Sequence, residues 1–229
     1  MDISHRLAPP GPGHPLGTDQ YGRDILSRLM RAAPAAVGTG LGATALGALV
    51  GVPLGLLAGY YRGWLDEVAM RLMDGLYAFP FILFALLVVA GLGPGLGNAV
   101  FAIGLVGSPV FARLARAEAL GLRERQFVEA ARAAGARDLT ILLRHILPNA
   151  LPTLAVQASL AFSGAVLAEA ALSFLGLGTQ PPHPSWGRML EEAQSYLTIS
   201  PWPALFPGLA IAVTVLGFNL LGDGLRDRL

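Results

Sequence analysis

The sequence contains no lysine, and all sixteen of its basic side chains are arginines. A P-loop requires a lysine that reaches the phosphates of ATP, so this chain cannot bind ATP in that way. Lysine Schiff-base chemistry is excluded for the same reason. Both kinds of lysine-dependent site are therefore closed to this chain. Any ATP hydrolysis coupled to it belongs to a partner.

Cysteine is absent as well, which excludes disulfides, thiolate zinc sites and iron–sulfur ligands. The four histidines, His5, His14, His145 and His183, have no metal-ligand spacing, and we predict no metal site. Charge is also scarce. Only 14% of the residues are charged, 54% are hydrophobic, and the mean hydropathy is +0.57. This composition indicates a polytopic membrane protein.

Uncharged stretches long enough to cross a bilayer, which takes about 20 apolar residues, follow one another along the chain. The first is residues 32–61. Residues 75–112 are too long for one span and are broken by a glycine-rich hairpin at residues 91–98, which makes two helices. The fourth stretch begins at Asn149, and the fifth ends at Gly222. We predict an all-α fold, a transmembrane bundle of five helices.

The segments around the first span differ in character. Glycine and alanine are frequent in residues 32–61, which suits close helix packing in lipid. Before this span, Asp24 is placed to cap a short helix at residues 25–30 that we expect to lie in the membrane interface. After it, residues 62–74 are expected to form a charged turn, and Phe79-Pro80-Phe81 falls near the start of the second span.

The least membrane-like part of the chain is residues 123–149, which carry five arginines. Two short helices are predicted to meet there at a corner. Gly135 is well placed as the left-handed residue that ends the first helix, and Asp138 as the cap of the second. Pro148 is expected to close the second helix. Its apolar stripe is predicted to consist of Leu139, Leu142, Leu143 and Ile146.

Charge and amphipathicity allow two interpretations of this corner. A positively charged cytoplasmic loop can rest on anionic lipid. Alternatively, the corner is a docking knob for another protein, because small alanines permit close approach and flanking charges fix orientation.

The order of residues favours docking. Glu129-Ala130-Ala131, then Gly135, and finally Leu147-Pro148 resemble the E-A-A loop of bacterial ABC importer permeases, by which a membrane subunit grips its ATPase subunit. An isoleucine is usual where His145 stands. The run from Arg144 to Asn149 is nevertheless similar to the local form in peptide and nickel importers, specifically in the C-type permease of dipeptide and oligopeptide systems.

Two further passages carry the same resemblance, residues 14–28 and residues 172–190. The likeness extends from Pro15 to the end of the chain. It implies an external or interfacial segment at residues 1–31 and a permease domain at residues 32–229, with a cytoplasmic coupling loop at residues 119–149. The residues that the resemblance assigns to ATPase docking are Glu129, Ala130, Ala131, Gly135, Arg137, Asp138, Leu147 and Pro148.

The resemblance also implies the surroundings of the chain. The expected partners are a B-type permease, two ABC ATPase subunits, an extracytoplasmic substrate-binding protein and membrane lipid, with no nucleic acid. The expected location is the bacterial cytoplasmic (inner) membrane, crossed several times. A cytoplasmic central loop obeys the positive-inside rule and leaves the N-terminus outside. Because family members have one more helix before this point, we hypothesise that the start is truncated or misassigned, or that a partner helix substitutes.

Polar residues within the predicted spans are the candidates for a translocation path: Gln157, Ser163, Glu169 and Asn219. An acid in a membrane helix is a functional candidate by default. Glu169 falls near the far end of its helix, where an interfacial, solvated role is the alternative. For Gln157 and Ser163 the alternative is a hydrogen bond between helices.

The resemblance implies a permease subunit of an ATP-driven importer for di- or oligopeptides, with nickel as the alternative cargo. Such a subunit is not an enzyme and has no cofactor of its own, because the partner ATPase subunits bind the ATP. An ATP-independent secondary transporter or channel would need ion-coupling groups at mid-membrane, and the spans offer none apart from Glu169. A purely structural membrane scaffold is disfavoured by so specific a docking loop.

Overall fold

The computed structural model describes residues 5–227; residues 1–4 and 228–229, the ends of the two predicted segments, lie outside the described residues. Within 5–227 every named element is helical, which confirms the all-α prediction. In chain order the helices are α1 (Ile25–Tyr61), α2 (Gly63–Tyr77), α3 (Phe81–Leu92), α4 (Leu96–Leu122), α5 (Gln126–Ala133), α6 (Asp138–Ile141), a π-helical turn (Leu142–Ile146), α7 (Leu147–Phe174), α8 (Trp186–Ala193), a 3₁₀ turn (Gln194–Tyr196) and α9 (Trp202–Arg226).

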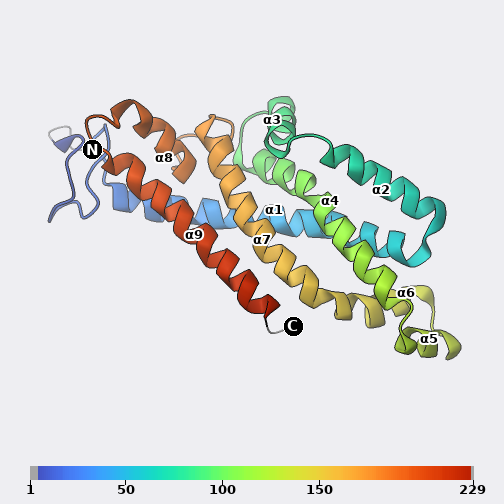
Figure 1. Ribbon diagram of the computed structural model, residues 1–229. Coiled ribbons are helices and arrows are strands. Elements are labelled where there is room, and N and C mark those ends of the chain that lie inside the picture. The colour runs from blue at the N-terminus through green and yellow to red at the C-terminus, as the bar shows by residue number, and fades with distance from the viewer. Residues whose placement is uncertain (1–4, 228–229) are drawn as a thin grey trace.

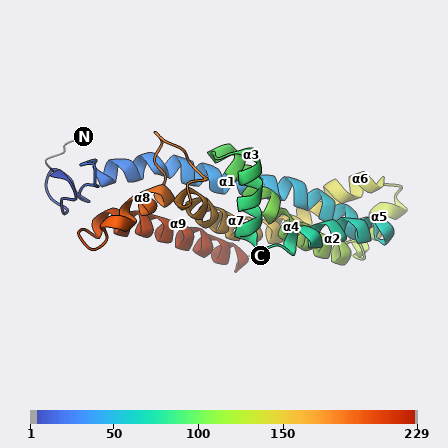
Figure 2. The same cartoon turned by 90° about the horizontal axis from the view of Figure 1, so that it is seen from above.

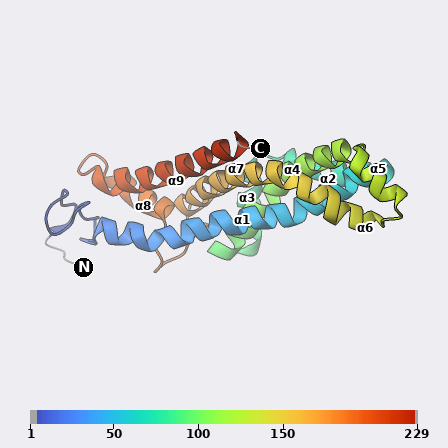
Figure 3. The same ribbon diagram turned by 90° about the horizontal axis from the view of Figure 1, so that it is seen from below.

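The molecule is elongated, and α1 runs along most of its length (Figure 1). The N-terminal segment and α8 lie at one end, whereas α5 and α6 lie at the other. Seen from below, α1, α7 and α9 run side by side (Figure 3). The chain therefore places its N-terminal segment and its basic corner at opposite ends of one bundle.

Four helical stretches among the described residues are long and apolar enough to cross a membrane: α1, α4, the continuous run from α6 through α7, and α9. A fifth span is possible only as the pair α2 and α3, which are bent by 88° to each other. Figure 2 shows α3 lying across the long helices. With 12 residues, α3 is about 18 Å long and too short to span a bilayer by itself.

The expected charged turn at residues 62–74 is wrong, because residues 63–74 belong to α2 and Arg62 is its N-cap residue. The break comes later, at residues 78–80, between α2 and α3. Pro80 has no backbone N–H and disfavours a helical conformation in the residue before it. The proline thus separates α2 from α3, whereas the sequence pattern places it near the start of a single helix, the second predicted span.

The short interfacial helix expected at residues 25–30 is also wrong as a separate element, since α1 continues without interruption to Tyr61. Asp24 does cap it, and its side chain accepts a hydrogen bond from the Ser27 N–H at 2.8 Å. Ile25 and Ala32 are fully buried in a core that also contains Phe162 and Trp186. This packing stabilises the first turns of α1 as part of the long helix.

A row of glycines, Gly47, Gly51, Gly55 and Gly59, lies at the contact between α1 and α4. A Cβ atom added at Gly55 would stand 2.1 Å from the carbonyl oxygen of Ala112, and one at Gly51 would stand 2.3 Å from that of Ser108. Only glycine lets the two backbones approach so closely. The predicted close packing is confirmed, and it holds α4 rigidly against α1.

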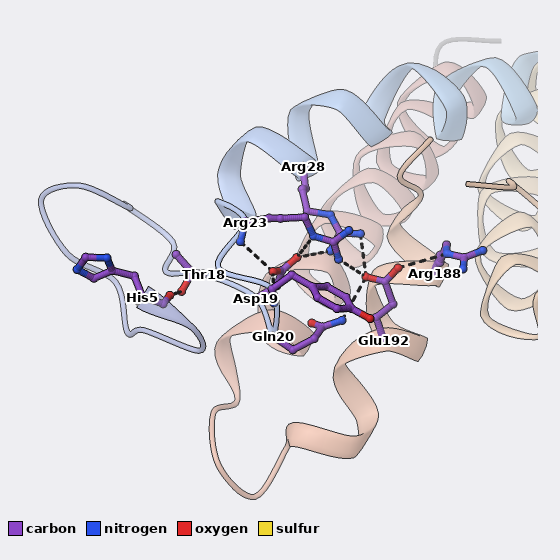
Figure 4. A network of polar contacts seen from close by, with 9 residues as sticks. His5, Thr18, Asp19, Gln20, Arg23, Arg28, Arg188 and Glu192 are labelled. Atoms are coloured by element: carbon purple, nitrogen blue, oxygen red, sulfur yellow. Dashed lines mark hydrogen bonds and ion pairs between the residues drawn. The ribbon is translucent and has the colours of Figure 1, made fainter. Parts of the chain in front are cut away.

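The N-terminal strap, residues 5–24, is fastened to α8 by a network of charges (Figure 4). The Asp19 carboxylate accepts from Arg23 and Arg28, both at 2.6 Å. Glu192 on α8 accepts from the same two arginines, at 2.7 and 3.0 Å, and from Arg188 at 3.3 Å. The network joins segments about 170 positions apart in the chain.

Candidate functional site

The basic corner consists of α5, α6 and the residues between them. Gly135 has φ +80°, which confirms the left-handed conformation predicted for it. The Ala136 N–H bonds to the Ala131 carbonyl oxygen, and the Gly135 N–H bonds to that of Arg132, both at 3.0 Å. These two bonds form a Schellman motif, which ends α5 and reverses the chain toward α6.

The inner side of the corner is seated on the bundle. Val128 and Ile141 are fully buried, and they pack in one core with Leu56, Phe111 and Ala115 from α1 and α4. Burying each such side chain contributes about 1.5–3 kcal/mol. The corner therefore moves with the ends of the long helices and is not a loose loop.

Polar contacts tie the corner to the end of α1. The Tyr60 hydroxyl donates to the Asp138 carboxylate at 2.7 Å and accepts from Arg132 at 3.4 Å. Arg123 donates to the Tyr60 carbonyl oxygen. The prediction that Asp138 caps α6 is wrong, because Arg137 is the N-cap residue and no side chain caps this helix. The partner of Asp138 is 78 positions away, which local spacing does not reveal.

The docking residues predicted from the sequence fall into two groups. Six are exposed: Glu129, Ala130, Gly135, Arg137, Asp138 and Pro148. Ala131 and Leu147 are half-buried and pack against the core beneath the corner. The exposed residues from Glu129 to Asp138 thus lie on the surface of the corner, whereas Pro148 is exposed in the first turn of α7.

The predicted apolar stripe of the second helix is partly wrong. Leu142 and Ile146 are buried as expected, but Leu139 and Leu143 are 64% and 54% exposed. Ile141, which the stripe omitted, is buried. The π-helical turn adds a residue to the turn that follows α6, so a uniform 3.6-residue period assigns the wrong face. The outer surface therefore offers two leucines that the sequence pattern assigned to the core.

Pro148 does not close the second helix, contrary to expectation. The helix continues through the π-helical turn into α7, and the Leu147 N–H bonds to the Leu142 carbonyl oxygen. Local π-helical adjustment of this kind accommodates a proline within a membrane helix. The corner and the fourth predicted span are thus one continuous rod.

The four residues predicted for a translocation path have different surroundings. Gln157 lines a cavity between α1, α4 and α7. The Ser163 hydroxyl donates to the Val215 carbonyl oxygen of α9 at 3.2 Å. This is the hydrogen bond between helices that was the alternative interpretation of Ser163. Asn219 lies half-buried on α9.

Glu169 is only 1% exposed, so the solvated interfacial role is wrong. Its carboxylate accepts from the hydroxyls of Ser173 at 2.6 Å and Thr179 at 3.1 Å. Because Thr179 lies beyond the end of α7, the acid holds the following loop against that helix.

Comparison with known proteins agrees with this architecture. Residues 51–229 match the family described as "Binding-protein-dependent transport system inner membrane component". The chain belongs to this family. It is 49% identical over 220 residues to the glutathione transport system permease protein GsiD of Pectobacterium atrosepticum, covering 96% of this chain and 73% of the relative. It is 47% identical over 226 residues to the dipeptide transport system permease protein DppC of Alkalihalophilus pseudofirmus, covering 99% and 74%.

Solved structures share the fold. A chain of the MetNI methionine ABC transporter in an inward-facing conformation superposes with a TM-score of 0.73 at 20% identity, over 89% of this chain and 97% of that one. A chain of an amino acid ABC transporter crystallised with histidines gives 0.62 at 20% identity, over 90% and 94%.

Family membership makes the chain a multi-pass membrane protein and the permease subunit of an ATP-driven importer. Transporters of this family work with ATPase and substrate-binding partners. The match to permeases supports this assignment over the ATP-independent transporter considered from the sequence.

Proposed function

We propose that the basic corner is the surface on which an ATPase subunit docks, within a coupling loop at residues 119–149 of a permease domain at residues 32–229. The observation that supports this most strongly is the corner's two-sided construction. Its inner side is fixed by Val128 and Ile141, while Glu129, Ala130 and Leu139 face outward. A lever needs such a rigid mounting and an open outer surface.

The mounting suggests how ATP hydrolysis would move the membrane helices. The corner continues as one rod into α7, and Tyr60 ties it to α1. Movement of a docked ATPase would therefore displace the ends of α1, α4 and α7 together. A shift between outward and inward states needs such differential contacts in the two states. The chain itself takes no catalytic part.

The cargo we propose is a small peptide, a di- or oligopeptide. This proposal rests on the relatives, which are named as glutathione and dipeptide permeases at 49% and 47% identity. We further propose a B-type permease as the second membrane subunit, two ATPase subunits and an extracytoplasmic binding protein, in the bacterial inner membrane. The N-terminal segment, residues 1–31, would then lie on the outer side.

A charge reversal at the corner tests docking. Glu129→Arg changes an exposed side chain and should leave folding intact, but we expect it to weaken ATPase-subunit binding at least tenfold. Glu67→Arg is the matched control, because this exposed carboxylate on α2 lies outside the corner. Binding is measured by co-purification from membranes and by titration of the purified ATPase against the permease in vesicles.

Gly135→Trp tests coupling in the same preparation. Its φ of +80° disfavours any side chain. We expect ATP hydrolysis to persist while peptide uptake is lost. Normal coupling in this variant, or equal ATPase binding by the two glutamate variants, would show that the ATPase docks elsewhere.

A further inference from the structure

A half-enclosed cavity of about 370 Å³ lies between α1, α4 and α7 and the hinge that joins α2 to α3. This volume is at the lower end of the range for small-molecule sites, roughly 300–1,000 Å³. The walls are mostly apolar. The cavity is therefore large enough for part of a small ligand but not for a whole oligopeptide.

The cavity lies midway along the bundle. Its α1 wall contains Ala43 and Thr44, which stand at the centre of the 37-residue helix. Its α4 wall is formed around Gly107, near the centre of residues 96–122, and its α7 wall contains Gln157. The space thus lies midway along helices that are long and apolar enough to cross a membrane.

Aromatic side chains from the α2–α3 hinge stand at the mouth. Tyr77 and Phe79 line the cavity and are nevertheless 56% and 54% exposed. Arg113 holds the hinge from α4, because it pairs with Asp74 at 2.7 Å and lies 4.3 Å from the centre of the Tyr77 ring. The mouth therefore opens to the outside of this chain beside a fixed aromatic rim.

The interior combines free space with polar groups that can bind a peptide. A Cβ atom added at Gly107 or Gly164 would meet nothing within 4 Å. The buried hydroxyl oxygen of Thr44 has no hydrogen-bond partner in the part of the chain that the structure describes. Buried polar groups generally have a partner. Neighbouring atoms cover the Thr44 hydroxyl, so it can bond to a molecule in the cavity once its side chain turns toward that space. The amide of Gln157 lines the same space.

We propose that this cavity receives an apolar side chain of the cargo peptide during transport, while Thr44 and Gln157 bond to the peptide's backbone. The proposal rests on the peptide-import function proposed above and adds a site that selects among peptides. Apolar walls favour peptides with leucine-like or aromatic side chains over glycine peptides, which have no side chain to bury. Two hydrogen-bonding groups match the amide donor and carbonyl acceptor of one peptide unit.

Filling the cavity tests the proposal. We would reconstitute the complete importer in vesicles, with its partner permease, ATPases and binding protein, and compare uptake of Leu-Leu and Gly-Gly dipeptides. Gly107→Leu and Gly164→Leu should lower Leu-Leu uptake at least tenfold while Gly-Gly uptake stays within twofold of wild type. Gly38→Leu is the matched control, because Gly38 is an exposed α1 glycine with open space around it and does not line the cavity.

A second variant enlarges the cavity and so avoids overpacking. Val110→Ala should raise uptake of Phe-Phe relative to Leu-Leu by about threefold. Equal effects on all dipeptides, or no effect in any cavity variant, would overturn the proposal. A lipid that co-purifies with wild type and is lost from Gly164→Leu, without a change in peptide preference, would assign the cavity to an acyl chain instead.

These outcomes separate the two proposals. If wild type binds its ATPase but takes up no peptide, the peptide-import function is wrong and the cavity proposal falls with it. If wild type imports peptides and the filled variants do not discriminate among them, only the cavity proposal is wrong.

Discussion

The two ends of the molecule are both rich in arginine, but they use it in opposite ways. At the strap end, Arg23 and Arg28 are partly buried and pair with Asp19 and Glu192 of the same chain. At the corner, exposed arginines such as Arg137 surround a core that is held mainly by apolar side chains. Charged side chains that pair within the chain stabilise its fold. Exposed charged side chains are available to a partner.

The largest effect on stability is expected at the strap. Asp19→Asn leaves two guanidinium groups beside a neutral amide, and breaking a buried ion pair costs roughly 3–5 kcal/mol. Because Glu192 still pairs with both arginines, we expect a loss near the lower limit, about 3 kcal/mol in the free energy of unfolding. Denaturation of the purified protein measures it. Glu191→Gln, a neighbouring acid with no ion pair among residues 5–227, is the control; equal losses would contradict the comparison.

The second largest effect is expected on acidification, which should destabilise the attachment of the strap to α8. Burial acts to raise the pKa of Glu192, but the charges of Arg28 and Arg23 and their hydrogen bonds outweigh it and lower that pKa. A lowered folded-state pKa contributes stability above the ordinary value, about 4.3, which is lost as the pH falls through the folded value. The protection of strap amides against hydrogen exchange, relative to the intrinsic exchange rate at each pH, should therefore fall below about pH 4. An identical acid response in Glu192→Gln would show that another group is responsible.

A smaller effect is expected where the corner meets α1. Tyr60→Phe removes the hydroxyl that bonds to Asp138 and Arg132 but keeps the ring. The loss of such a hydrogen bond costs about 1 kcal/mol. Thermal unfolding measures the change, with Tyr61→Phe as the control because Tyr61 is 49% exposed. No difference between the two variants would mean that this tie does not hold the corner.

The smallest effect on stability is expected on the outer surface of the corner. Arg137→Glu should change the free energy of unfolding by less than about 0.5 kcal/mol, as is usual for exposed positions. The same change should weaken ATPase-subunit binding at least tenfold if the corner is the docking surface. Thermal unfolding and co-purification together separate the two effects. A large loss of stability would show that Arg137 is part of the fold.

Much of the fold followed from local pattern. The uncharged stretches predicted the long helices, and the glycine content of residues 32–61 predicted their close packing. The left-handed Gly135 was predicted because few residues other than glycine adopt that conformation. Errors occurred where a proline or a π-helical turn changed the helix, at Pro80 and at Leu142–Ile146.

The sequence by itself determined the class of molecule, because apolar length, the absence of lysine and the order of residues around Glu129 and Gly135 are local properties. Tertiary structure alone decided which corner leucines face outward, which charges are neutralised and where a cavity remains between α1, α4 and α7. These features depend on contacts between residues far apart in the chain, such as Tyr60 with Asp138 and Arg23 with Glu192. No local period encodes such contacts.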